Sequence, residues 1–85
     1  MGCWDYRVIK KSISGRSYYS VRECYYNNCG DKIPHSWTAE SSNVCSDSVE
    51  DLKEEFNMML LAFNKPVLVE EFNSEEGREI LVEDK

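Results

Sequence analysis

The chain has 85 residues, of which 41% are hydrophobic and 31% charged, a composition typical of one small globular domain and too apolar for a disordered chain. It has no apolar run near the roughly 18 residues of a membrane-spanning helix and no signal-peptide pattern, so no membrane contact and a cytoplasmic location are expected. The net charge is −6, with twelve acidic and four basic residues after position 40. Nucleic acid attracts basic faces, so it is not an expected partner.

Three strands are expected in the first half of the chain. Residues 4–10 alternate between apolar and polar side chains, and residues 18–26 are rich in aromatic and branched ones, which suit a pleated surface. Turn-forming residues at 12–17 separate these two segments, and a second reversal at 27–32 leads to a short strand at 35–39. Because the three segments follow one another through tight reversals, they predict a three-stranded antiparallel meander.

A helix is expected between Ser48, a candidate N-cap, and Pro66, which ends the helix near Asn64. Its apolar residues recur every three or four positions and predict a stripe that packs on the sheet. The stripe consists of Val49, Leu52, Phe56, Met59, Leu60 and Phe63. The expected fold is therefore α+β, a three-stranded antiparallel sheet packed against one amphipathic helix, with Phe56 in the core.

Met58 and Leu61 lie off that stripe and need another cover. Two alternatives remain for what covers these two residues. One is the returning segment 66–72, which is favoured because only a short connection joins it to the helix, and the other is a second protein molecule. Residues 1–72 are expected to form one domain. The acidic segment 73–85 either adds a short strand near 79–83 or stays a mobile tail.

The chain has four cysteines and one histidine, but their spacing lacks the two close ligand pairs of a structural zinc site. Cys24 and Cys29 flank the second reversal and are close enough to form a disulfide, although reduced thiols are expected in a cytoplasmic protein. No phosphate-binding loop or catalytic triad pattern is present. We therefore expect no enzyme activity, cofactor or metal, and keep a thiol or metal site at Cys24, Cys29 and His35 as the less favoured reading.

Several stretches resemble a family of short bacterial proteins of uncharacterised function. They are "WDYRVIKK", "YYSVRECYYN", "SWTAES" and "SVEDLKEEFNMMLLAFNKPVL", which together cover most of the chain up to Leu68. Cys29, the residues around "GDKIPHSW" and the acidic extension depart from the family pattern. The order of strands and helix is also similar to the N-terminal domain of HicB-type antitoxins, although their "P-x-x-P-G-C" segment is missing. The first resemblance implies no activity, and the second implies a regulatory protein.

The expected function is a non-enzymatic binding or regulatory module, as an antitoxin or a phage-type inhibitor would be. Its acidic helix and tail would contact a partner with a basic surface. The alternative is a structural domain that self-associates through the apolar helix surface. The candidate contact residues are Glu50, Asp51, Glu54, Glu55, Met58 and Leu61.

Overall fold

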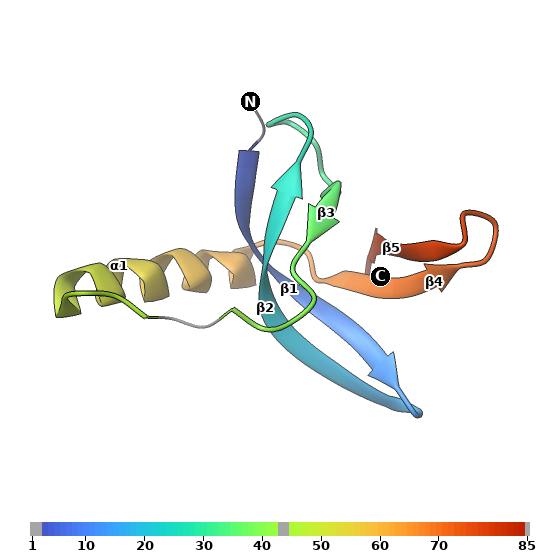
Figure 1. Ribbon diagram of the computed structural model, residues 1–85, viewed down its shortest axis with the longest axis horizontal. Coiled ribbons are helices and arrows are strands. Elements are labelled where there is room, and N and C mark those ends of the chain that lie inside the picture. The colour runs from blue at the N-terminus through green and yellow to red at the C-terminus, as the bar shows by residue number, and fades with distance from the viewer. Residues whose placement is uncertain (1–2, 43–44, 85) are drawn as a thin grey trace.

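A computed structural model describes residues 3–42 and 45–84 of the chain. The elements follow the order β1 (Cys3–Ile13), β2 (Arg16–Tyr26), β3 (Ser36–Trp37), α1 (Val49–Leu60), the 3-10 helix η1 (Leu61–Asn64), β4 (Leu68–Asn73) and β5 (Arg78–Glu83). The strands form one sheet in the order β3-β2-β1-β4-β5 (Figure 1). The fold is α+β, but the expected three-stranded antiparallel meander is wrong, because the sheet has five strands and is mixed.

The longest feature of the sheet is the β1–β2 hairpin, which is paired without interruption from Cys3↔Tyr26 to Ile13↔Arg16. Ser14 and Gly15 form its two-residue turn with φ angles of 51° and 81°. Positive φ at both positions is what the right-handed strand twist favours, and glycine adopts it without strain. The turn is thus shorter than the expected 12–17, and the end of the hairpin extends beyond the other strands (Figure 1).

Strand β4 lies parallel to β1, with Ile9 opposite Leu68, and β5 pairs antiparallel with β4. The segment expected to fold back along the helix therefore enters the sheet instead. The β4–β5 turn is held by Asn73, whose Oδ1 accepts hydrogen bonds from the Glu75 and Glu76 backbone N–H groups at 2.9 and 3.0 Å. Residues Arg78–Glu83, within the segment that the sequence left between a strand and a mobile tail, form the edge strand.

On the other edge, β3 is only two residues long, shorter than the expected strand at 35–39. The chain around it still follows β2, because the N–H groups of His35, Thr38 and Ser42 donate hydrogen bonds to β2 carbonyls at 2.7 to 3.0 Å. These bonds hold the long connection between β2 and α1 against the sheet edge.

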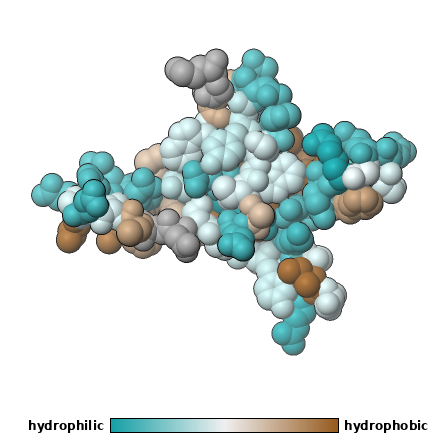
Figure 2. Space-filling view, viewed as in Figure 1, coloured by the Kyte–Doolittle hydropathy of each residue, from teal (hydrophilic) through white to brown (hydrophobic). Residues whose placement is uncertain are grey.

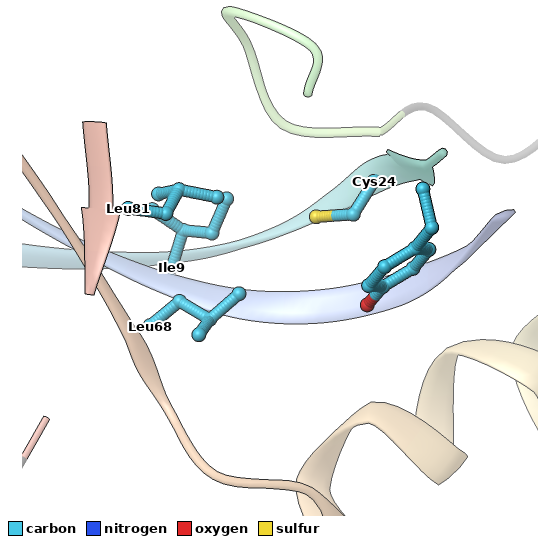
Figure 3. Packing of buried hydrophobic residues seen from close by; sticks show 5 residues of the cluster. Ile9, Cys24, Leu68 and Leu81 are labelled. Atoms are coloured by element: carbon cyan, nitrogen blue, oxygen red, sulfur yellow. The ribbon is translucent and has the colours of Figure 1, made fainter. Parts of the chain in front are cut away.

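The core consists of two small clusters of buried side chains. Ile9, Cys24, Tyr26, Leu68 and Leu81 form the first cluster (Figure 3). Trp37 packs against this cluster. Tyr6, Val8, Met59 and Ala62 form the second cluster, with Val21 and Val67 at its margin. Because the side chains of Val8 and Ile9 point to opposite faces of β1, the two clusters lie on the two sides of the sheet.

The helix begins and ends where the sequence predicts. Ser48 is the N-cap, its Oγ accepting a hydrogen bond from the Asp51 N–H at 3.1 Å, and helical structure ends at Asn64, before Pro66. The prediction that the helix buries its apolar stripe is wrong. Within α1 only Met59 is buried, while Phe56 and Phe63 are 51% and 65% exposed. The side of the helix that faces the sheet is therefore not the side on which the apolar residues recur.

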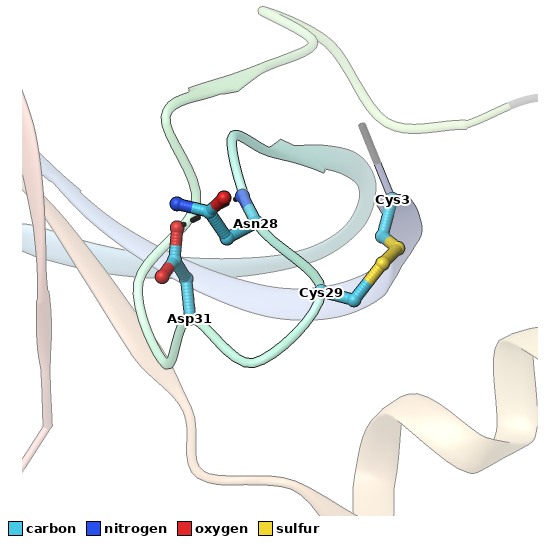
Figure 4. The surroundings of a disulfide bond; sticks show 4 residues. All are labelled: Cys3, Asn28, Cys29 and Asp31. Carbon is cyan, nitrogen blue, oxygen red and sulfur yellow. Dashed lines mark hydrogen bonds between the residues drawn. A yellow bond between two sulfur atoms is a disulfide. The ribbon is translucent and has the colours of Figure 1, made fainter. Parts of the chain in front are cut away.

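A disulfide joins Cys3 to Cys29, with their Cα atoms 5.2 Å apart (Figure 4). Asn28 and Asp31 close the loop that carries Cys29, the Asn28 N–H donating to Asp31 Oδ2 and the Asp31 N–H to the Asn28 carbonyl, both at 3.1 Å. The suggested Cys24–Cys29 pairing is wrong, because Cys29 pairs with Cys3 and Cys24 is a buried free thiol. The Cys3–Cys29 bond also differs from the reduced state expected of these thiols. A crosslink between residues 26 apart contributes about 3 to 4 kcal/mol by restricting the unfolded chain.

Candidate interaction surface

Helix α1 extends away from the sheet, with its N-terminal end farthest out (Figure 1). Taken at about 100° per residue, the side chains of α1 and of η1, which continues it, fall into three sectors. The sheet sector, formed by Leu52, Glu55, Met59 and Ala62, contains the buried and half-buried residues. Figure 2 shows hydrophobic side chains along one edge of this projecting arm and hydrophilic ones along the opposite edge. Most of the helix surface is thus available for contacts outside the chain.

Glu55 attaches the helix to the sheet. Its Oε2 accepts a hydrogen bond of 2.7 Å from the hydroxyl of Tyr6, a buried residue of β1 whose ring packs edge-on against Trp4. Burial of the phenol, with the hydrogen bond to Glu55 and its negative charge, raises the pKa of Tyr6 to about 12. Glu55, one of the predicted contact residues, is therefore engaged inside the chain.

The other five predicted contact residues share the acidic sector, which we define as Glu50, Asp51, Glu54, Met58 and Leu61. They lie within about 100° of one another around the helix, and all five are exposed. Met58 is 42% and Leu61 57% exposed, so the expected cover by segment 66–72 is wrong. Three carboxylates on the first two turns, near the positive end of the helix dipole, make this sector strongly negative.

The third sector, which we call the apolar seam, consists of Val49, Phe56, Leu60 and Phe63. These residues lie within about 60° of one another, and their side chains are 81%, 51%, 60% and 65% exposed. The spacing of apolar residues in the sequence identified the residues of the seam. Spacing alone does not show whether another element of the fold packs on them. Of the six residues in the predicted stripe, only Leu52 and Met59 lie on the side of the helix that faces the sheet.

Arg22 and Glu70 are buried charged residues on the sheet face opposite α1. Arg22 is 5% and Glu70 9% exposed, and they form an ion pair at 2.9 Å. The second Glu70 oxygen accepts a hydrogen bond from the indole N–H of Trp37 at 3.2 Å, and Lys11 lies 3.7 Å from the carboxylate. This network links β2 and β3 to β4 across β1, so these charges serve the fold.

A second buried network surrounds Arg7. Its guanidinium donates hydrogen bonds to the Tyr26 hydroxyl at 3.0 Å and to the Pro66 carbonyl at 2.8 Å. The Tyr26 hydroxyl donates to Asp5, which also pairs with Lys65. Burial and the bond to Asp5 raise the pKa of Tyr26 to about 12, against the opposing effect of Arg7. Arg7, like Arg22, thus uses its charge inside the fold.

Cys24 and Cys29 do not provide the thiol site that the sequence left as the less favoured alternative, since Cys29 is in a disulfide. Burial, reinforced by the charge of Asp5, raises the pKa of the Cys24 thiol to about 12, which leaves no reactive thiolate at neutral pH. In residues 3–42 and 45–84 no three His, Cys, Asp or Glu side chains gather as metal ligands would. Nor does any helix in these ranges have the length and apolarity to cross a membrane.

Comparisons with protein-family models, with curated proteins and with solved structures find no match to this chain. The resemblances to the family of short bacterial proteins and to HicB-type antitoxins therefore stay predictions.

Proposed function

We propose that this protein is a non-enzymatic protein-binding module that uses the acidic sector of α1 to contact a partner with a basic surface. The observation that carries the proposal is the exposure of Glu50, Asp51 and Glu54 on a helix that projects from the sheet. Among the described residues, none of these three carboxylates forms an ion pair with a basic side chain. Their charge is therefore free to attract an outside partner.

The acidic sector also has the composition of a contact site. Met58 and Leu61 continue it along the helix with apolar area, next to the charged first turns. Interfaces commonly combine such an apolar centre with a polar rim. Charge at the rim acts mainly on the rate of association, and apolar burial acts on the lifetime of the complex. The proposal extends to a regulatory role of the antitoxin or phage-inhibitor kind, in which binding alone alters the partner.

The test begins with a partner captured by the intact protein and then purified, so that association can be followed with defined components. A variant with Glu50→Lys, Asp51→Lys and Glu54→Lys should associate more slowly and depend less on salt, because steering by charge is lost. The matched control is Glu71→Lys, Glu75→Lys and Glu79→Lys, which makes the same charge change at exposed positions of β4, β5 and their turn. Equal slowing in both variants would show that net charge, and not the helix, attracts the partner.

A cytoplasmic location is also part of the proposal. The sequence favours a cytoplasmic location, whereas a disulfide such as Cys3–Cys29 persists in oxidising surroundings and is rare in the cytosol. The two expectations predict opposite redox states in cells. Alkylation of thiols in acid-quenched extracts separates them: a mainly reduced pair supports the cytoplasm, and a fully oxidised pair contradicts it.

A further inference from the structure

We propose that the apolar seam of α1 binds the seam of a second copy of this chain, with the two helices antiparallel. The seam lies on a different sector of the helix from the acidic one. The inference therefore goes beyond the proposed function, and each can fail without the other.

The residues of the seam are spaced as in paired helices. Val49, Lys53, Phe56, Leu60 and Phe63 follow one another at intervals of four, three, four and three residues. This is the spacing with which paired helices interlock their side chains along a common line. Helix η1 keeps the line intact, because its tighter turn still brings Phe63 above Leu60. The seam is thus continuous over both helical segments.

The exposed apolar area of the seam is close to the area that a specific dimer interface buries. Taking roughly 150 to 200 Å² for each side chain when fully exposed, the four apolar residues present on the order of 450 Å² per copy. Two copies would remove about 900 Å² of apolar surface from water, to which the flanking residues of both helices add, and specific interfaces begin near 1,000 to 1,200 Å² in total. The seam is therefore large enough for a specific dimer of modest affinity.

The distribution of charge along the helix favours an antiparallel over a parallel pair. The acidic residues of α1 lie in its first half, while residues 56–64 carry no charge. In a parallel pair, Lys53 would meet Lys53 of the second copy, and the acidic turns would lie side by side. In an antiparallel pair centred on Phe56, Lys53 packs near Leu60 of the second copy and Val49 near Phe63. Like charges are then separated, and the helix dipoles oppose each other favourably.

Other occupants of the seam fit less well. Segment 66–72, the nearest part of the same chain, is committed to the sheet through β4. An anionic membrane surface would be repelled by the carboxylates of the same helix. In the proposed dimer the two acidic sectors remain outside the pair and stay open to other partners.

Sedimentation equilibrium across roughly 1 to 200 µM, where a modest dimer dissociates, tests the proposal on the full chain. Wild type should be a dimer at the upper concentrations. Phe56→Glu should raise the dissociation constant about 30-fold or more, as loss of a central contact does, while its helix content by circular dichroism stays unchanged. The control is Phe72→Glu, because Phe72 is 64% exposed but lies in β4. It should leave the dimer intact.

Orientation has its own test. Val49→Glu and Phe63→Lys should each weaken the dimer, and mixing the two variants should restore it, because antiparallel helices bring positions 49 and 63 together. A monomeric wild type at the highest concentration, or equal dissociation by Phe72→Glu, would overturn the dimer. Failure of the mixed pair to associate would overturn the antiparallel arrangement. None of these results depends on a basic partner, so they are separate from the test of the acidic sector.

Discussion

Replacing Glu70 by alanine should destabilise this domain more than any change on the surface of α1. The substitution leaves the buried Arg22 guanidinium without its carboxylate at 2.9 Å and leaves the Trp37 indole N–H without its acceptor. Breaking a buried pair in this way costs about 3 to 5 kcal/mol. A chain of 85 residues has a total stability of roughly 4 to 13 kcal/mol. Glu70→Ala should therefore lose a large part of the stability of the domain.

Urea unfolding, followed by circular dichroism, measures this loss. Glu71→Ala is the matched control, because Glu71 is the exposed neighbour in the same strand, and it should change the free energy of unfolding by less than about 0.5 kcal/mol. Replacing both charges, with Arg22→Met and Glu70→Leu, should recover most of the loss, since neither buried charge is then left unpaired. A loss below about 1 kcal/mol for Glu70→Ala, typical of an exposed ion pair, would refute the arrangement of β4 beside β1.

The remaining predictions concern titrating groups. A thiol reagent should modify the exposed Cys45 quickly and the buried Cys24 only after unfolding, so a fast phase that persists in Cys45→Ser would be contrary to expectation. The folded-state pKa values of Tyr6 and Tyr26 are raised to about 12 from 10.0, so both phenols stabilise the fold fully below pH 10 and lose this contribution as the pH rises toward 12. Urea titrations at several alkaline pH values should show this loss, and Tyr6→Phe should reduce it; a flat stability profile up to pH 12 would contradict it.

The features that the sequence predicted correctly depend on neighbours in the chain. Ser48 caps the helix through a bond to a residue three positions later, and Pro66 stops it by its own backbone geometry. The first hairpin follows from alternation and a glycine-containing turn. Strand β4 was missed because its parallel pairing with β1 joins segments almost 60 residues apart. No tight turn connects the two strands, so the sequence carries no local sign of their pairing.

Sequence spacing also located the predicted contact residues on the helix, while their contact with a partner stays a prediction. Periodicity placed Glu50, Asp51, Glu54, Met58 and Leu61 on one side of the helix, where the structure exposes them. It could not show that Glu55 bonds to Tyr6, a residue 49 positions away.

The sequence analysis also did not predict that charged residues are buried. Arg22 and Glu70 look like surface residues by type. Each lies two positions from a buried residue of its strand, Cys24 or Leu68, which is the one sign that it points to the same face. Their pairing needed the three-dimensional order of the strands.

The free energy of unfolding of Phe56→Ala tests most directly the claim that α1 presents its apolar seam outward. The measurement uses protein diluted below the dimer range and compares this variant with Leu68→Ala. Leu68 is fully buried and should cost about 2 to 5 kcal/mol. Phe56 is half exposed and should cost about 1 kcal/mol. A loss of about 3 to 5 kcal/mol for Phe56→Ala, the range of a buried phenylalanine, would place the seam in the core and contradict the account.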